Sequence, residues 1–172
     1  PVQVSLTVTT NTDRVDAVVT ARWRFDAATQ APNANPPVDG LTVTLADGQV
    51  HPLTELLGGD TIALPRKVET KLGAIVEPSA SETYQGLDDD GLLATLRERL
   101  FITWFVETGD THDTHTSYFP GRTPFEAMLK NTWKPAERRL YPRDAARLFV
   151  VLHDNRGGVS WRAGVVRLEP TP

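Results

Sequence analysis

The sequence predicts a mainly β protein: an antiparallel β-sandwich with one or two short helical insertions and an added N-terminal β-hairpin. Leu100 to Val106 (LFITWFV) carries apolar side chains at both alternating sets of positions, as expected for a central strand covered on both faces. Leu148 to Leu168 contains two apolar strands joined by the turn residues DNRGG. Turn residues recur about every 8–12 residues, which is typical of sandwiches, and the strand–helix alternation of a parallel sheet is missing.

Composition narrows the classes of function. The chain has 172 residues, enough for one good core or two small ones. Its net charge of −4 is scattered and gives no field that would attract nucleic acid or an anionic membrane. There is no cysteine, so disulfides, thiolate metal sites and a cysteine nucleophile are excluded. No apolar run is long enough to span a bilayer, and a start at Pro1 predicts a processed product or part of a longer one.

Residues 1–30 predict a hairpin with one apolar face. Apolar and polar residues alternate from Val2 to Val8 and again from Val15 to Phe25, and the turn residues Asn11-Thr12-Asp13 lie between. Residues 31–40 predict a linker, because Ala31 to Val38 (APNANPPV) has no periodicity and three prolines. Residues 41–172 then form the sandwich.

The first part of the sandwich predicts short strands at 41–45, 50–53, 61–64 and 67–76. Asp47-Gly48 is a strong turn signal between the first two, and residues 54–59 predict a turn or a single helical turn. Residues 78–91 are polar and predict a loop. Leu92 to Arg99 has good helix formers and predicts a short helix leading into the LFITWFV strand.

The second part predicts a loop at 108–116, a short strand at 117–119 and a helix from about 123 to 130. Thr123 suits an N-cap, Pro124 the first helical position, and Glu126 a capping box. Asn131 to Pro135 (NTWKP) is expected to end the helix as a loop. Strands at 147–153 and 159–168 make the closing hairpin.

The order ITWFVETG, NTWKP and LFVVLHDNRGGVSW resembles the Ig-like or PKD-like domains of bacterial cell-surface and periplasmic lipoproteins. The resemblance covers residues 60–168, and NANPPV resembles the linker that joins such domains in tandem. It implies extracytoplasmic β-sandwich modules for display, spacing or adhesion, with no shared catalytic residues. The chain departs from the pattern in its short first segment, its helical insertion at 123–130 and His153, where Arg or another polar residue is more usual.

The N-terminal hairpin is expected to pack against another protein surface. Two strands alone are marginally stable in water, so the hairpin must pack on its own module or on a neighbouring subunit. The predicted partner-contact residues are Val2, Val4, Leu6, Val8 and Trp23.

Two segments are candidates for metal binding. Imidazoles and carboxylates suit a divalent ion such as Zn²⁺, and four occur within six residues: Asp110, His112, Asp113 and His115. A polar hairpin tip is the alternative. Asp88-Asp89-Asp90-Gly91 does not fit an EF-hand register, because Arg97 would occupy the Glu position. A looser Ca²⁺ loop and a solvated acidic loop both remain open.

Aromatic residues are candidates for sugar stacking. Trp133 and Tyr118 are the predicted platform, with Trp161 and Trp23 as further members, against an alternative of core packing. Arg156 is expected to be a turn residue paired locally with Asp154.

The sequence therefore predicts a non-enzymatic, extracytoplasmic structural or protein-interaction subunit that docks through sandwich edges. Its expected partners are other protein subunits or copies of itself, without nucleic acid or a transmembrane segment. No cofactor is expected, with Ca²⁺ or Zn²⁺ as the open alternatives. The alternatives for function are a carbohydrate-binding module and a metal-dependent hydrolase. The carboxylates Glu98 and Glu107 give no glycosidase signature, and no Ser-His-Asp spacing marks a nucleophile elbow.

Overall fold

The computed structural model describes the backbone of residues 2–9 and 14–21 and all of residues 33–88 and 90–169. The chain divides into two compact units, residues 1–33 and residues 34–172. The predicted linker, residues 31–40, spans this division.

The first unit contains the predicted N-terminal hairpin. β1 (Val2–Thr9) pairs antiparallel with β2 (Arg14–Ala21), which confirms the hairpin. Val2 is paired with Ala21, Val4 with Val19, Leu6 with Ala17 and Val8 with Val15. Paired positions in an antiparallel ladder lie on the same face, so the register places these aliphatic positions on one face. Trp23 and Phe25 lie outside the described residues.

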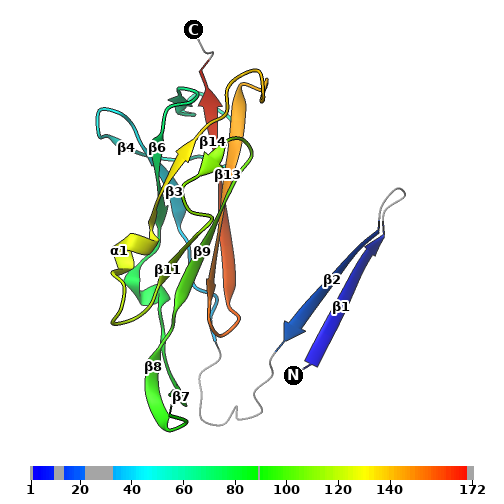
Figure 1. Ribbon diagram of the computed structural model, residues 1–172, viewed down its shortest axis with the longest axis vertical. Coiled ribbons are helices and arrows are strands. Elements are labelled where there is room, and N and C mark those ends of the chain that lie inside the picture. The colour runs from blue at the N-terminus through cyan, green and yellow to red at the C-terminus, as the bar shows by residue number, and fades with distance from the viewer. Residues whose placement is uncertain (1, 10–13, 22–32, 89, 170–172) are drawn as a thin grey trace. The chain divides into compact units, whose positions relative to one another are not determined.

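The second unit is built from two five-stranded sheets (Figure 1). The first sheet has the order β10-β12-β6-β3-β4. Its strands are β3 (Gly40–Thr44), β4 (Val50–Pro52), β6 (Thr70–Ile75), β10 (Asp110–Thr111) and β12 (Lys130–Lys134). The second sheet has the order β11-β9-β13-β14-β5. Its strands are β5 (Ala63–Leu64), β9 (Leu100–Val106), β11 (His115–Tyr118), β13 (Ala145–Asp154) and β14 (Val159–Leu168).

One hydrophobic core lies between the two sheets. Alternate residues of the second sheet are buried in it, including Ile102, Val150 and Leu152, and the first sheet contributes Val43 and Trp133, all with no exposed surface. This alternation follows from the two-residue period of side chains along a strand. The prediction that LFITWFV is an inner strand is confirmed, because β9 pairs with both β11 and β13.

The pairing of strands is mainly antiparallel, as expected, with one parallel pair. β5 pairs parallel with β14, so the second sheet is mixed. The segment that precedes β5 follows the edge of β14. The Val165 N–H donates to the Thr54 carbonyl and the Arg167 N–H to the Ile62 carbonyl, both at 2.8 Å. This segment satisfies β14 backbone donors that would otherwise be left unpaired.

The helix predicted at Leu92 to Arg99 is wrong, and so is the loop predicted at 78–91. β7 (Thr83–Leu87) and β8 (Leu93–Arg97) form a two-stranded hairpin after the 3₁₀ turn η1 (Pro78–Ala80). The Asp88 carboxylate closes the hairpin turn, accepting from Asp90 N–H at 3.0 Å and Leu92 N–H at 2.8 Å. Strand pairing and this turn therefore override the helix propensity of the leucines.

The predicted helical insertion is present as α1 (Phe125–Met128), but the predicted cap is wrong. Pro124 occupies the N-cap position, and the Thr123 hydroxyl instead accepts from Phe119 N–H at 2.7 Å. NTWKP is not a loop. It forms strand β12, because its backbone pairs with β6 and its tryptophan fills the core.

Residues 34–39, the first part of the second unit, have no regular structure but pack along its second sheet. Pro36 and Val38 are buried. The Asn35 side-chain oxygen accepts from Val159 N–H at 3.1 Å, and the Ser160 hydroxyl donates to the Pro36 carbonyl. This end of the predicted linker is therefore fixed along the start of β14.

Candidate functional site

The solvent side of the second sheet carries an apolar band that we call the outer face. Cross-strand register brings its residues into rows, because Phe105, Phe149 and Ala163 are neighbours, as are Thr103, Val151 and Trp161. Phe105 is 51% exposed and Trp161 is 59% exposed. The outer face consists of Phe101, Phe105, Phe149, Val151, Val159 and Trp161.

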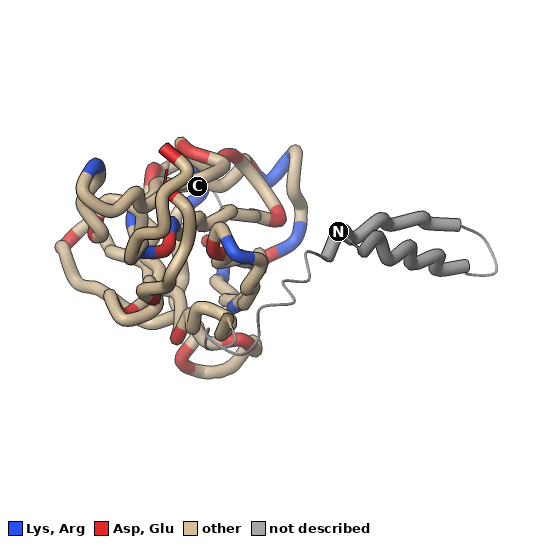
Figure 2. Tube along the Cα trace, turned by 90° about the horizontal axis from the view of Figure 1, so that it is seen from below, with Lys and Arg blue, Asp and Glu red and all other residues tan. Residues whose placement is uncertain are grey.

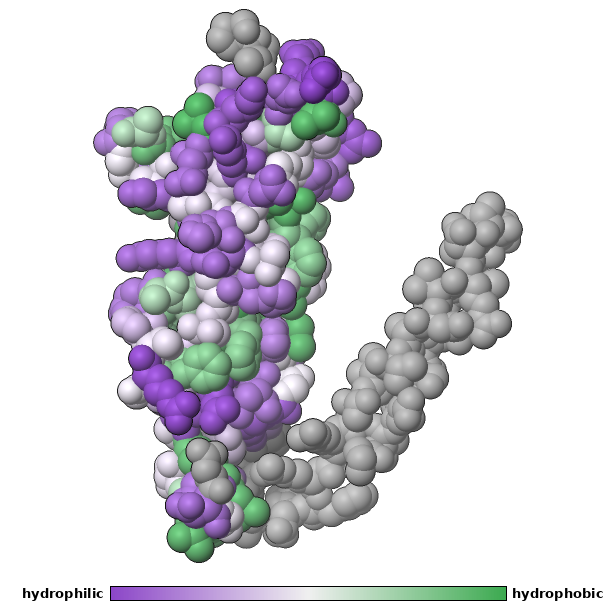
Figure 3. All heavy atoms as spheres, viewed as in Figure 1, coloured by the Kyte–Doolittle hydropathy of each residue, from purple (hydrophilic) through white to green (hydrophobic). Residues whose placement is uncertain are grey.

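The prediction that β9 is covered on both faces is wrong. Its inner face is buried, but Phe105 on the other face is half exposed. In Figure 3, hydrophobic residues gather along the side of the unit where β13 and β14 lie. Large contiguous apolar patches on a protein surface mark interaction sites more often than scattered single residues do. The outer face is therefore the strongest candidate for a binding surface among the described residues.

Aromatic contacts order one end of the outer face. The His153 ring stacks on Phe101 with centroids 5.1 Å apart, and Phe119 meets Phe101 edge-on at 5.7 Å. The polar positions on this side of β9, β11, β13 and β14 carry hydroxyl, imidazole or guanidinium groups and no carboxylate: Thr103, His115, Ser117, Arg147, His153 and Arg167. Elsewhere on the unit, acidic and basic residues are interspersed (Figure 2).

β14 also has a short open edge next to the outer face. Val159 N–H is satisfied by Asn35 and Val165 N–H by Thr54. Trp161 and Ala163 lie between them at the same alternate positions, and the described residues supply no acceptor for their N–H groups. An unpaired strand edge accepts an added strand, so this edge suits the predicted docking mode.

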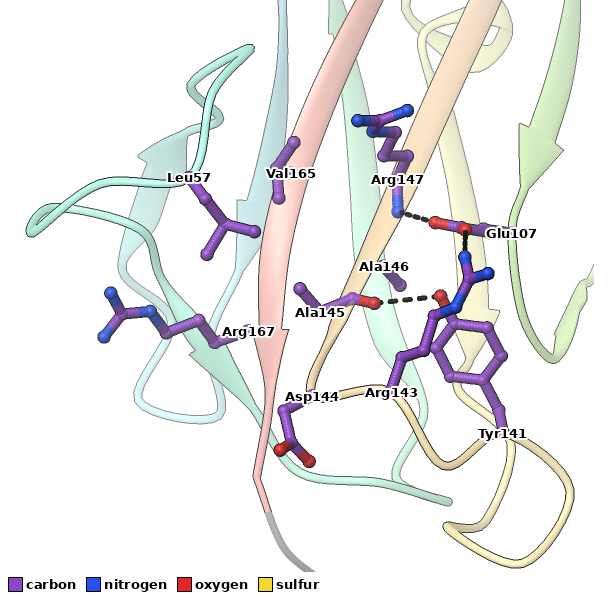
Figure 4. Close-up of a pocket in the computed structure, with 10 residues that line it drawn as sticks. All are labelled: Leu57, Glu107, Tyr141, Arg143, Asp144, Ala145, Ala146, Arg147, Val165 and Arg167. Carbon is purple, nitrogen blue, oxygen red and sulfur yellow. Dashed lines mark hydrogen bonds and ion pairs between the residues drawn. The ribbon is translucent and has the colours of Figure 1, made fainter.

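A hollow of about 510 Å³ lies where β13 begins, lined by Glu107, Tyr141 and Arg143 among others (Figure 4). The Glu107 carboxylate accepts from Arg143 at 2.8 Å and from Arg147 N–H at 3.0 Å, as Figure 4 shows. The Tyr141 hydroxyl donates to the Ala145 carbonyl at 2.9 Å. Burial, followed by the Glu107 charge, raises the pKa of Tyr141, so its hydroxyl stays protonated.

Buried Arg66 holds the loop that borders this hollow. Its guanidinium donates to the carbonyls of Tyr141, Arg143 and Glu169. The sequence did not mark Arg66, because its partners come from two distant segments. The polar groups around the hollow, including both oxygens of Glu107, are therefore used to hold this loop, and the hollow is not a candidate binding site.

The carboxylate Glu98 is buried with an ion partner. Its side chain is 1% exposed, and Arg156 donates to it at 2.9 Å. The Arg156 guanidinium also lies 4.7 Å from the centre of the Tyr84 ring. The prediction that Arg156 pairs with Asp154 holds only for its backbone N–H, which donates to the Asp154 carboxylate at 2.7 Å. The side chain instead links the β13–β14 turn to the end of β8.

The predicted zinc residues are not brought together. His112 Nδ1 lies 4.0 Å from Asp113, with both side chains mostly exposed, and His115 Nδ1 lies 2.9 Å from the Thr114 hydroxyl. Asp110 and His115 are on strands of different sheets. Among the described residues there is no group of three or more metal-ligating side chains. In the predicted calcium segment, one Asp88 oxygen accepts from the backbone of the turn.

The predicted sugar platform does not form. Trp133 has no exposed surface, and its indole N–H donates to the Thr108 carbonyl at 2.7 Å. Tyr118 packs edge-on against Phe125 at 5.1 Å. Trp161 is the described tryptophan with the most exposed ring, and Trp23 lies outside the described residues.

Comparison with known protein families, with curated proteins and with solved structures gives no match. Within the described part of the chain, no helix has the length and apolar character that crossing a membrane requires.

Proposed function

We propose that this chain is a non-enzymatic structural or protein-interaction subunit of an extracytoplasmic assembly, built on an Ig-like or PKD-like β-sandwich. The two sheets around one core support the sandwich, and the order of sequence motifs supports the Ig-like or PKD-like resemblance and the location outside the cytoplasm. The subunit docks on other subunits through its sheet edges and exposed sheet face.

The observation that carries this proposal is the outer face. A sheet that needed only to fold would alternate apolar and polar residues, with the polar residues facing water. Here Phe101, Phe105, Phe149 and Val151 occupy the solvent-facing positions of the inner strands β9 and β13. Complete burial of an exposed large apolar side chain is worth roughly 1.5–3 kcal/mol, and the half-exposed Phe105 and Trp161 can each contribute part of this to a complex.

The N-terminal hairpin is a second docking element. Its register places Val2, Val4, Leu6 and Val8 on the same face as the aliphatic positions of β2. Two paired strands alone are only marginally stable in water, so the hairpin is expected to pack on another surface.

The partner to which we commit is a second copy of this chain. Each copy has the outer face, a hairpin whose register puts its aliphatic positions on one side, and an open edge at Trp161 and Ala163. Copies can therefore cover one another without another component. Contact between two outer faces gives a two-fold dimer, whereas contact between the outer face of one copy and the hairpin of another is head-to-tail and gives rings or filaments.

The test is sedimentation velocity of variants of the full chain. Phe105→Ser with Trp161→Ser should weaken self-association by about a hundredfold or more, because two large apolar contacts are lost. The matched control is Leu56→Ser with Leu140→Ser, which removes two leucines that are 80% and 70% exposed elsewhere. Deletion of Val2 to Phe25 removes the hairpin and should also abolish assembly. The truncated chain should still fold, because residues 34–172 have their own core. Unchanged association of both the outer-face variant and the deletion would contradict the proposal.

The exposed indole of Trp161 favours one alternative, a carbohydrate-binding module. A flat apolar face with an exposed tryptophan also suits a sugar chain. Retention of the native chain on insoluble cellulose or chitin, lost in Trp161→Ser, would favour this function over self-assembly.

A further inference from the structure

A second hollow, of about 420 Å³, lies between the β7–β8 hairpin, the turn after β11 and the β13–β14 turn. We call it the arginine pocket and define it by Arg97, Arg99, Arg122, Tyr84, Phe119 and Asn155. We propose that the arginine pocket binds a carboxylate from an acidic segment of a partner protein. This inference concerns different residues from the outer face and does not depend on self-assembly.

Charge is unbalanced in the arginine pocket. Among the described residues, Arg99 and Arg122 have no carboxylate within ion-pair distance, whereas Arg143 pairs with Glu107 and Arg156 with Glu98. Asp88 is the one carboxylate among the residues that line the hollow, and one of its oxygens accepts from two backbone N–H groups. The hollow therefore carries excess positive charge on a chain whose net charge is negative.

Two of the three arginines, Arg97 and Arg99, have fixed contacts before any ligand arrives. Arg99 N–H donates to the Asn155 side chain at 2.9 Å, and Asn155 N–H donates back to the Arg99 carbonyl at 3.2 Å. The Arg99 guanidinium lies 5.7 Å from the centre of the Phe119 ring. Arg97 is fixed by the oxygens of Ser81 and Pro78. Planar guanidinium groups recognise a carboxylate through paired hydrogen bonds, and Arg99 and Arg122 have no carboxylate partner among the described residues.

The surroundings favour a peptide over a sugar. Both aromatic rings of the hollow are already in contact with arginine, Tyr84 with Arg156 and Phe119 with Arg99. Beside the hollow, the β7–β8 tip exposes leucines, and Figure 3 shows hydrophobic residues there. These are Leu87, Leu92 and Leu93, between 65% and 74% exposed. A segment with Asp or Glu next to aliphatic residues fits both features.

The experiment measures fluorescence anisotropy of a labelled peptide, acetyl-LEELEEL-amide, with the full chain. The native chain should bind it, and Arg99→Gln with Arg122→Gln should weaken binding about tenfold or more. Arg99→Lys with Arg122→Lys should restore only part of the affinity, because lysine keeps the charge but not the planar fork. The matched control, Arg138→Gln with Arg139→Gln, removes the same charge from another surface and should leave binding unchanged.

Three results would overturn the proposal. The first is equal binding of acetyl-LQQLQQL-amide, which would show that only apolar contacts matter. The second is binding of oligogalacturonate without binding of either peptide, which would assign the hollow to anionic sugars. The third is no binding of any probe by native chain whose thermal unfolding shows that it is folded.

Discussion

A single buried carboxylate, Glu98, links the stability of the fold to pH. Its carboxylate is nearly inaccessible to water and depends on two donors, Arg156 and the Glu82 N–H, at 2.9 and 3.1 Å. Burial raises the pKa of this carboxyl, and the charge of Asp154 acts in the same direction, while the Glu82 N–H and Arg156 lower it. The net result is a pKa above the ordinary value of 4.5.

This shift predicts a pH dependence with a definite sign. Because the pKa of Glu98 is higher in the folded chain, the folded chain binds the proton more tightly than the unfolded chain. The Glu98 contribution to the free energy of unfolding is therefore largest below pH 4.5 and falls as the pH rises through the raised pKa. In urea unfolding from pH 4 to 7, the native chain should lose stability relative to Glu98→Gln.

A suitable control is Glu126→Gln, which changes an exposed carboxylate in the first turn of α1. Comparison with this control separates the effect of Glu98 from the general effect of pH on the stability of the chain. A constant difference between the native chain and Glu98→Gln would show that burial does not raise the pKa of Glu98.

Residue roles were predictable only where neighbours in sequence decide them. The backbone bond of Arg156 to Asp154 follows from the turn, and it was expected. The side chain of Arg156 pairs with a carboxylate 58 positions away, which no local pattern reveals. Trp133 was misplaced for the same reason, because its burial depends on the pairing of β12 with β6.

At the scale of elements, clear two-residue alternation gave correct strands. β1 and β2 were predicted from it, β13 and β14 from two apolar runs joined by the DNRGG turn, and Asp47-Gly48 marked the β3–β4 turn, where Gly48 has a φ of 86°. The β7–β8 hairpin was missed because Leu93 to Arg97 are good helix formers with little burial. The acidic run ending at Gly91 was the available signal, since Asp and Gly also mark hairpin turns.

Two turn glycines, one of them between β9 and β10, allow a matched prediction about the free energy of unfolding. Gly109 and Gly121 share the same φ of 74°, but a Cβ at Gly109 would collide with the Lys134 carbonyl, whereas Gly121 faces open space. Gly121→Ala should cost about 1 kcal/mol for its positive φ alone. Gly109→Ala should cost roughly 3 kcal/mol or more, because β10 must also move away from β12.

Urea unfolding with a common m-value checks this pair of variants. Equal stability losses would mean that the β9–β10 turn does not need the close backbone approach that the structure shows.

At the scale of the whole molecule, the predicted mainly β character is confirmed, and the exposed sheet face was not foreseen. Both alternating sets of positions in LFITWFV are apolar, and this pattern was interpreted as burial on both faces. Sequence alone cannot separate a strand buried within one chain from a strand that awaits a partner, because both carry the same residues. The structure separates them by leaving Phe105 and Trp161 in solvent.

The central claim is that copies of this chain associate through such surfaces. The most direct measurement is the molar mass of residues 1–172 by light scattering on a sizing column, over a wide range of concentrations. We predict a mass well above the 19.0 kDa of one chain, rising with concentration. A mass of 19.0 kDa at every concentration would contradict self-assembly. The outer face would then be expected to bind a partner other than a second copy of this chain.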